Sequence, residues 1–223
     1  MPHIGVIAGT MIDTRMGVEL LDRHGFCAQG YPISTSCYEQ DSLQFLSANE
    51  LERMVVQRLE KMHGLDGCMV YCNSLSAAVD FAGLARDWDF PIITPFDAYS
   101  LIAMEYELLY ILAANSLATK HIEQHIKCAN PAMRFISVGW LGLVEIIESN
   151  AHEVIGQGFI AQDSGLRELC AFFEKIEPGV ENKALLLGCT HFPFMIHELR
   201  AITHLPIIDP AKVMIEIMIK TLK

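Results

Sequence analysis

The feature that most constrains the fold is an alternation of two kinds of segment along the chain. Short aliphatic runs, bounded by glycine, proline or small polar residues, recur as HIGVIA, YPISTS, GCMVY, FPIIT, LLYILA, MRFISV, KALLLG and LPIID. Such runs are typical of buried strands. Between most of them lie stretches with helical spacing of apolar residues, at 48–62, 76–87, 163–176 and 211–222. Strands that alternate with helices predict an α/β fold with largely parallel sheets.

Two of the apolar runs end in the same way, one in each half of the chain. CMVYCNSLSAA (68–78) and LLLGCTHFPF (185–194) both pass from an apolar run to a cysteine and then to small polar residues. This repetition predicts two similar Rossmann-like lobes that face each other across a cleft. We place the junction near Pro95, where a new helix begins. The first lobe is then 1–95 plus 205–223, because the last strand and helix are too short to stand alone, and the second lobe is 96–204.

Composition excludes several classes of protein. The chain has 223 residues, of which 52% are hydrophobic and 19% charged, so it is neither disordered nor of low complexity. Its most apolar passage contains Glu105 and Glu107, which argues against a membrane span. A net charge of −11 without a Lys/Arg cluster argues against nucleic acid or an anionic membrane as partner. The N-terminus shows no export signal, so we expect a cytoplasmic protein.

The cysteines of the two repeated motifs, Cys72 and Cys189, are the main candidates for chemistry. In a parallel sheet the carboxyl ends of the strands face the functional crevice, and the following helix begins there. Backbone N–H groups and the helix dipole at that place favour a thiolate, which makes the sulfur a competent base or nucleophile. The neighbours Asn73, Ser74 and Thr190 supply donors suited to a carboxylate. Two such thiols would flank one small acidic molecule.

Other sequence features have simpler interpretations. Seven cysteines without a CxxC pair predict free thiols rather than disulfides or zinc, and we expect the remaining five to be small apolar residues: Cys27, Cys37, Cys68, Cys128 and Cys170. His121 and His125 lie four apart on a predicted helix, but HIEQH lacks the HExxH order and a third ligand. The turn GVIAG is not GxGxxG. We therefore expect no metal and no dinucleotide cofactor.

The motifs carry a resemblance to a known family. VYCNSLSAA resembles the CNTxSA segment of the aspartate/glutamate racemase superfamily, and LLLGCTHFPFM is similar to its LGCTHYPLL segment. IGVIAG resembles the opening strand of that family, and LPIIDP, which ends at Asp209 and Pro210, matches its late strand. GWLGLVEIIE resembles the segment that contributes an accessory glutamate, here Glu145. The similarity runs over nearly the whole chain in the same order.

The resemblance implies a racemase that needs no cofactor. One cysteine thiolate removes the α-proton from one face of the substrate, and the other thiol returns a proton on the opposite face. It assigns these roles to Cys72 and Cys189, with His191 assisting Cys189. Asn73, Ser74 and Thr190 would hold the amino and carboxylate groups of a small acidic amino acid. Since relatives are often dimers, we also expect a homodimer.

The first loop departs from the family pattern. Glutamate racemases typically have an Asp-Ser pair after the first strand. Aspartate racemases have a GGMGP-like loop there instead. Here the place reads Ala8, Gly9 and Thr10. We assign Gly9 and Thr10 to substrate binding, with Asp13, Thr14 and Arg15 as candidates to replace the missing aspartate. Arg15 is of interest because a guanidinium grips a carboxylate with two hydrogen bonds.

A second loop matches the family only loosely. AANSLAT (113–119) stands where the family has ATxAT, so Asn115 and Ser116 either face the ligand or cap a helix.

Three alternatives to an aspartate or glutamate racemase remain open at the sequence level. The first is a related enzyme of the same group, such as a hydantoin racemase, a maleate isomerase or an arylmalonate decarboxylase, although a pair of cysteines favours racemisation. The second is a non-catalytic protein that senses an acidic ligand, which would bind without exchange of the α-proton. The third is a thiol redox protein, which usually has a CxxC arrangement.

Overall fold

The computed structural model describes residues 1–34, 46–150 and 165–222. Eight strands lie in this part of the chain: β1 His3–Ala8, β2 Cys27–Pro32, β3 Gly67–Val70, β4 Ile92–Ile93, β5 Leu108–Ala113, β6 Arg134–Gly139, β7 Lys183–Gly188 and β8 Ile207–Ile208. The α-helices there are α1 Met11–Arg23, α3 Ala48–Leu59, α4 Asn73–Ala78, α5 Phe81–Leu84, α6 Pro95–Ile102, α7 Ser116–Ala129, α8 Leu141–Asn150, α10 Leu166–Lys175, α11 Ile196–Ile202 and α12 Pro210–Thr221. Short 3₁₀ turns are η1 Glu60–Met62 and η2 Phe192–Met195.

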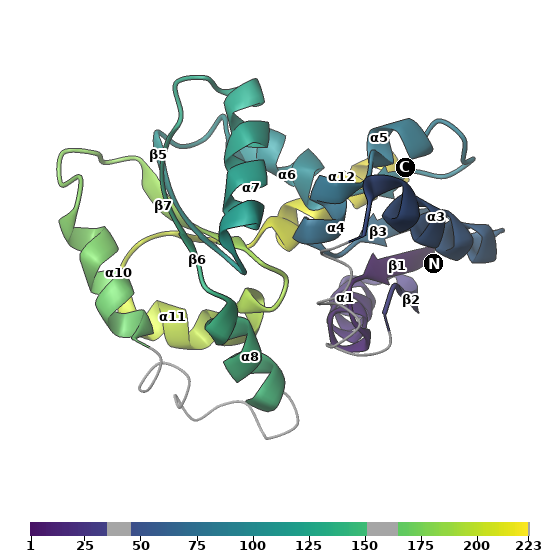
Figure 1. The fold of residues 1–223 in the computed structure, drawn as a ribbon, viewed down its shortest axis with the longest axis horizontal. Coiled ribbons are helices and arrows are strands. Elements are labelled where there is room, and N and C mark those ends of the chain that lie inside the picture. The colour runs from purple at the N-terminus through teal and green to yellow at the C-terminus, as the bar shows by residue number, and fades with distance from the viewer. Residues whose placement is uncertain (35–45, 151–164, 223) are drawn as a thin grey trace. The chain divides into compact units, whose positions relative to one another are not determined.

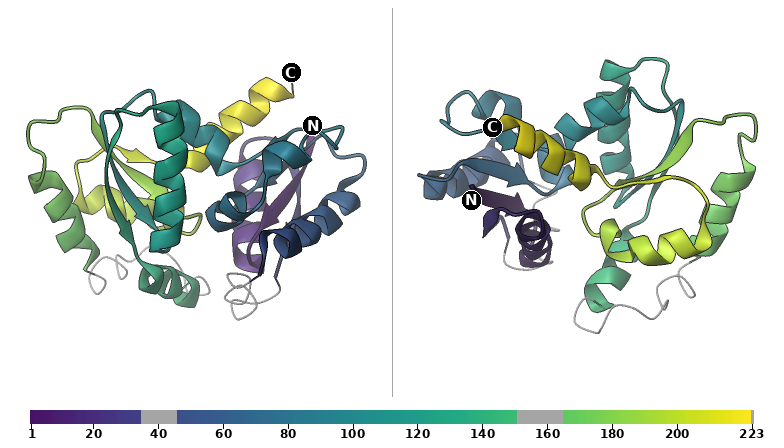
Figure 2. Two further views of the ribbon diagram at one scale, coloured as in Figure 1. Left: turned by 45° about the horizontal axis from the view of Figure 1, so that its top comes forward. Right: turned by 180° about the vertical axis from the view of Figure 1, so that it is seen from behind.

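The strands form two four-stranded sheets (Figures 1 and 2). The first sheet has the order β2-β1-β3-β4 and the second has the order β6-β5-β7-β8. Every pairing among these strands is parallel. The predicted α/β class with parallel sheets is therefore confirmed.

The chain divides into two compact units. Unit 1 comprises Met1–Ala98 and Ala211–Lys223, and unit 2 comprises Tyr99–Pro210. The division falls inside α6 and at the start of α12, so in both places the chain passes from one unit to the other within a helix. The last helix belongs to unit 1.

The first strand and helix of each unit match position by position. β5 begins and ends 105 residues after β1. The buried residues of α7 (Ala118, Thr119, Ile122, Ile126) likewise lie 105 residues after those of α1 (Asp13, Thr14, Gly17, Leu21). The residues that cap the two helices, Thr10 and Asn115, keep the same offset. The two units are thus structural repeats, in the order of their strands and in the face that each first helix buries.

Each sheet has a core that ends at a cysteine. In unit 1, Cys68, Val70 and Cys72 pack with apolar residues of α3. In unit 2, Leu185, Leu187 and Cys189 pack with residues of α8, α10 and α11. Because side chains alternate along a strand, the opposite faces are left for α1 and α7. Figure 1 shows α7 and α10 on opposite faces of the second sheet.

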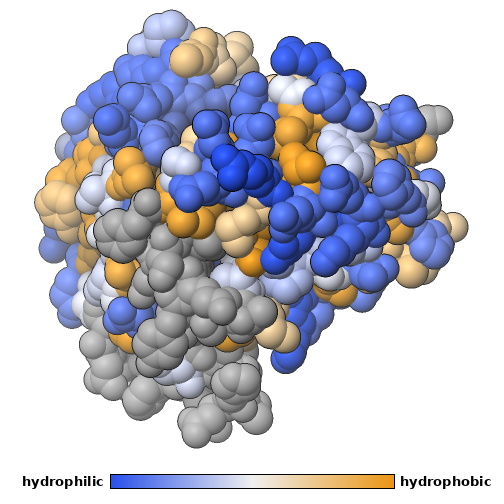
Figure 3. Space-filling model, turned by 45° about the vertical axis from the view of Figure 1, so that its right-hand side comes forward, coloured by the Kyte–Doolittle hydropathy of each residue, from blue (hydrophilic) through white to orange (hydrophobic). Residues whose placement is uncertain are grey.

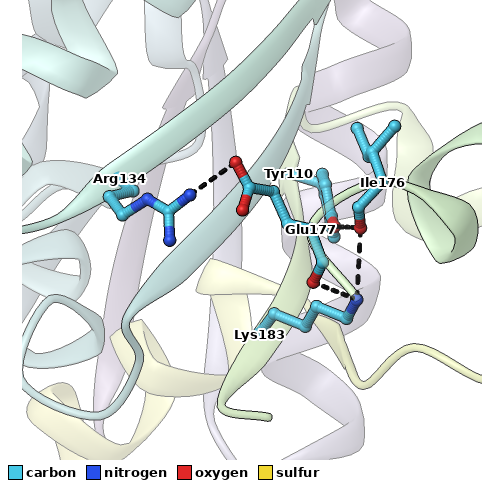
Figure 4. A network of polar contacts seen from close by, with 5 residues as sticks. All are labelled: Tyr110, Arg134, Ile176, Glu177 and Lys183. Carbon is cyan, nitrogen blue, oxygen red and sulfur yellow. Dashed lines mark hydrogen bonds and ion pairs between the residues drawn. The ribbon is translucent and has the colours of Figure 1, made fainter. Parts of the chain in front are cut away.

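Polar side chains form a network near the amino ends of the strands of the second sheet (Figure 4). Lys183 Nζ donates to the carbonyl oxygens of Ile176 (3.4 Å) and Glu177 (3.1 Å), and Tyr110 Oη donates to Ile176 O at 3.1 Å. Glu177 has a positive φ of 52° and forms an ion pair with Arg134. These contacts hold the turn between α10 and β7 against the strands β6, β5 and β7. Burial raises the pKa of Tyr110.

Hydrophilic and hydrophobic side chains are intermixed on the face shown in Figure 3. The large apolar side chains that are exposed are scattered along the chain: Met1, Met11, Leu101, Met104, Leu117, Leu141, Phe172 and Ile219. No helix in the described part of the chain is long and apolar enough to cross a membrane.

Three local expectations were wrong. The last strand, β8, was placed with the first lobe but pairs with β7 in the second sheet. The stretch 76–87, predicted as one helix, is divided between α4 and α5, because Asp80 ends the first segment and its side chain caps the second by accepting a hydrogen bond from Gly83 N at 2.9 Å. The strand predicted at YPISTS instead begins at Cys27 and ends at Pro32. Cys37 lies outside the described residues.

Candidate active site

Cys72 lies at the carboxyl edge of the first sheet, two residues beyond β3. It caps α4 with an extended backbone, and its side chain is 6% exposed. Its carbonyl accepts hydrogen bonds from Ser76 N (3.1 Å) and Ser76 Oγ (2.7 Å), which fixes the backbone at the thiol. Asn73 is buried and Ser74 is exposed. The strand end, the cap and the serine together determine where this sulfur lies.

Cys189 occupies the equivalent place in unit 2, directly after β7. It is 8% exposed, and its Sγ lies 3.6 Å from Nδ1 of His191, which is 2% exposed. Thr190 is also buried. A thiol and an imidazole at this distance can share a proton, so Cys189 has a neighbour able to accept or return one. The predicted neighbour His191 therefore lies in contact with the Cys189 sulfur, and its assisting role stays a prediction.

The helix that follows each thiol is shorter than the sequence suggested. α4 has only six residues, and Cys189 is followed by the 3₁₀ turn η2 before α11 begins at Ile196. Pro193 stands in that turn, where it cannot donate a backbone hydrogen bond. Contrary to expectation, no α-helix begins directly at Cys189, because the 3₁₀ turn η2 separates it from α11.

The first loop of unit 1 is closed by its own hydrogen bonds. Gly9 O accepts hydrogen bonds from Ser34 N (3.0 Å) and Ser34 Oγ (2.7 Å). Thr14 Oγ1 donates to Thr10 O at 2.6 Å, and Thr10 Oγ1 accepts from Asp13 N at 3.2 Å. Thr14 therefore uses its hydroxyl proton within α1, while Gly9 and Thr10 shape the loop through their backbone.

The two charged candidates of this loop lie on different faces of α1. Asp13 is 1% exposed and belongs to the buried stripe of the helix. Arg15 is exposed, and helical spacing places it on the side away from that stripe. Of the two, Asp13 is the better candidate for a role at the carboxyl edge of the first sheet. The proposed role of Arg15 as a carboxylate anchor gains no support from its position.

Asn115 and Ser116 begin α7 at the carboxyl edge of the second sheet. Asn115 Oδ1 accepts a hydrogen bond from Ala118 N at 2.9 Å, so this side chain caps the helix. Ser116 is exposed. Glu145 is also exposed, in the middle of α8. Ser116 thus keeps an exposed side chain at the start of α7, whereas the side chain of Asn115 is used as a cap.

Gly139, the last residue of β6, is a further residue at this edge that no sequence motif marks. A Cβ there would lie 2.5 Å from Ser116 N and 2.8 Å from Asn115 Cα. The only sequence signal was a glycine at the end of a predicted strand, which often marks a close backbone approach.

Metal binding finds no support in the described residues, which contain no group of three or more His, Cys, Asp or Glu side chains able to hold a metal. His125 Nε2 instead lies 3.0 Å from Ser100 Oγ, where it links α7 to α6. Of the other cysteines in the described part, Cys68 and Cys170 are buried as expected, but Cys27 is partly exposed and Cys128 is exposed.

Comparison with known proteins identifies the architecture. No protein-family profile and no curated protein sequence matches the chain. Solved structures match over almost its whole length. Glutamate racemase from Francisella tularensis in complex with D-glutamate has 19% identity and a TM-score of 0.70, over 99% of this chain and 80% of that one. The chain has the fold of the amino-acid racemases.

Two further solved structures with the racemase fold extend the comparison. An aspartate racemase homologue from Pyrococcus horikoshii has 13% identity and a TM-score of 0.65, with 100% of this chain and 99% of that chain covered. Allantoin racemase from Pseudomonas fluorescens has 15% identity and a TM-score of 0.68, with 98% and 89% covered. The fold implied by the sequence resemblance is confirmed. Because proteins with different substrates match about equally well, this similarity does not select one substrate.

Proposed function

We propose that this protein is a cofactor-independent racemase of an acidic amino acid, aspartate or glutamate. The observation that carries the proposal is the equivalence of the two thiols. Cys72 follows the third strand of the sheet β2-β1-β3-β4, and Cys189 follows the third strand of the sheet β6-β5-β7-β8. Each thiol stands at the carboxyl edge of its own sheet, where α/β proteins bind ligands.

The proposed reaction explains why two thiols are needed. A thiolate takes the α-proton, and the two electrons of the broken C–H bond pass into the planar carbanion. The second thiol then gives its own proton to the opposite face and becomes a thiolate. The net change is inversion at one carbon, without a change in oxidation state or the transfer of a group. His191 would hold a proton beside Cys189, and the buried carboxyl of Asp13 is the proposed acid/base helper in unit 1.

The site and the comparisons together suggest which substrates to test first. Aspartate and glutamate come first, since the polar residues Asn73, Ser74, Ser116 and Thr190 are suited to carboxylate and ammonium groups. A cyclic ureide such as allantoin is the second candidate, because a protein of that activity shares the fold.

Proton NMR in D₂O tests the proposal. Purified protein without added cofactor is incubated with each L- and D-enantiomer, and loss of the α-proton signal and optical inversion are followed together. Cys72→Ala and Cys189→Ala should each lose racemisation in both directions by at least about 10²-fold. Cys128→Ala, which changes an exposed thiol on α7, is the matched control.

The outcomes separate the alternatives. Inversion that needs both thiols establishes a two-thiol racemase and names its substrate. Binding without α-proton exchange would contradict the proposal and favour a ligand sensor. Light scattering of the purified protein tests the expected homodimer.

A further inference from the structure

The chain at the start of α7 passes unusually close to the end of β6. A Cβ placed on Gly139 would lie 2.5 Å from Ser116 N and 2.8 Å from Asn115 Cα, and it would meet the carbonyl carbon of Asn115 more closely still. All three neighbours are backbone atoms, so no side-chain rotation can make room. Only a residue without a side chain allows this approach.

The segment that lies against Gly139 is also fixed from within. Asn115 Oδ1 accepts from Ala118 N at 2.9 Å, and Asn115 O accepts from Thr119 N at 3.1 Å. Thr119 Oγ1 donates to Ser116 O at 2.8 Å. These hydrogen bonds link residues 115–119 to one another. A side chain at position 139 would therefore displace the whole first turn of α7 rather than a single peptide.

This contact lies on the same edge of the same sheet as Cys189. Ala113 is paired with Gly139 on one side and with Gly188 on the other. The three residues form one row across β6, β5 and β7, and Cys189 follows that row directly. Ser116 begins α7 three residues beyond Ala113, and it is exposed.

We propose that Gly139 is a positioning residue of the candidate site: by lacking a side chain, it sets the exposed Ser116 hydroxyl and the first turn of α7 at the height of Cys189. The inference rests on the proposed function, in which Ser116 is one of the polar residues that contact the substrate's carboxylate and ammonium groups. A hydroxyl held by a fixed backbone needs no reorganisation when a ligand arrives, which favours binding over a mobile one. Gly139 acts through Ser116 and touches no substrate.

Gly139→Ala tests this inference, with Gly5→Ala as matched control. Gly5 lies in β1 of the other unit, and a Cβ there would also collide with a neighbour, the side chain of Met62. Both variants overpack a strand, but only Gly139→Ala shifts the first turn of α7. For Gly139→Ala we expect KM for both enantiomers to rise at least about tenfold, with kcat changed less than about threefold. Gly5→Ala should leave KM unchanged.

A double variant separates positioning from general damage. In a Ser116→Ala background the effect of Gly139→Ala on KM should shrink, because the hydroxyl through which it acts is absent. Equal KM values for Gly139→Ala and the wild type, or an equal rise in Gly5→Ala, would overturn the inference. If Gly139→Ala does not fold, Asn115→Ala loosens the same turn by removing its cap, and an unchanged KM in that variant would overturn it as well.

Calorimetric binding of aspartate, glutamate and allantoin distinguishes failure of this inference from failure of the proposed function. A wild-type protein that binds one of them without exchanging its α-proton is no racemase, yet the loss of affinity in Gly139→Ala still supports the positioning role. A wild-type protein that binds none of them overturns both.

Discussion

Gly17 in α1 should tolerate no larger side chain, although it lies inside a helix where alanine is normally better. A Cβ at this position would lie 2.7 Å from Val6 Cγ1 and 3.1 Å from both Cβ and Cγ of Tyr71. Val6 is fully buried and Tyr71 is 3% exposed, and a buried valine has little rotamer freedom. Tyr71 directly precedes Cys72, so the packing of α1 bears on the candidate site.

The magnitude follows from two opposing effects. Replacing glycine by alanine within a helix stabilises by about 0.8–1 kcal/mol. Overpacking a well-packed core destabilises by about 1–3 kcal/mol. Because the three contacts involve a β-branched side chain and the stem of a tyrosine, we take the upper half of that range, and Gly17→Ala should lose about 1–2 kcal/mol. In a chain of this size the melting temperature should fall by about 2–8 °C.

Gly142 in the first turn of α8 provides the matched control. There the nearest atom to an added Cβ is Trp140 Nε1 at 3.5 Å, an ordinary contact. Gly142→Ala should therefore keep part of the helix preference and stabilise by up to about 0.5 kcal/mol. Thermal and urea unfolding followed by circular dichroism measure both variants. The reasoning is refuted if Gly17→Ala is as stable as the wild type, or if Val6→Ala fails to lessen its effect.

Three further measurements test other parts of the structure. His191→Ala should lower kcat/KM about 10²-fold, equally in both directions because racemisation has an equilibrium constant of one, and polarimetry from each enantiomer checks this. Burial raises the pKa of the Cys170 thiol from 9.0 to about 11. The stability that the buried, protonated thiol contributes is therefore complete below pH 9 and is lost as the pH rises towards 11. The loss of stability at alkaline pH, measured by urea unfolding, should be smaller in Cys170→Ala. Lys183→Met removes two hydrogen bonds to the turn at Glu177 and should destabilise by about 1–3 kcal/mol in the same assay, with no change in KM.

Much of the fold was predictable because it depends on local patterns. Helix α3 is marked by Ser47 and Glu50, which form a reciprocal capping box, and α6 begins at the proline where the sequence placed a helix start. The break between α4 and α5 was missed, because the Asp80 side chain caps a new helix in a stretch whose apolar spacing fits one continuous helix. Local capping there outweighed the spacing on which the prediction relied.

The candidate site was predictable only in part. Cys72 and Cys189 follow apolar runs, so their place at a sheet edge can be read from the sequence. The sequence could not show that Asn115 caps α7 or that the Thr14 hydroxyl is used within α1, since each side chain had two plausible partners. The role of Gly139 depends on a backbone approach between residues 24 positions apart in the chain, which apolar spacing does not encode.

The two units reach the same geometry by opposite means. Tyr71 precedes Cys72, and the helix residue that meets it is Gly17. Gly188 precedes Cys189, and a Cβ on it would lie 2.7 Å from Cδ1 of Ile122, the residue of α7 equivalent to Gly17. In each unit one partner is glycine and the other is large, but the large residue follows a strand in unit 1 and lies on the helix in unit 2. Each of these close contacts thus has room for one large side chain and not for two. A similar internal repeat can therefore remain in the structure after residue-by-residue likeness between the halves has been lost, apart from the cysteines at the two strand ends.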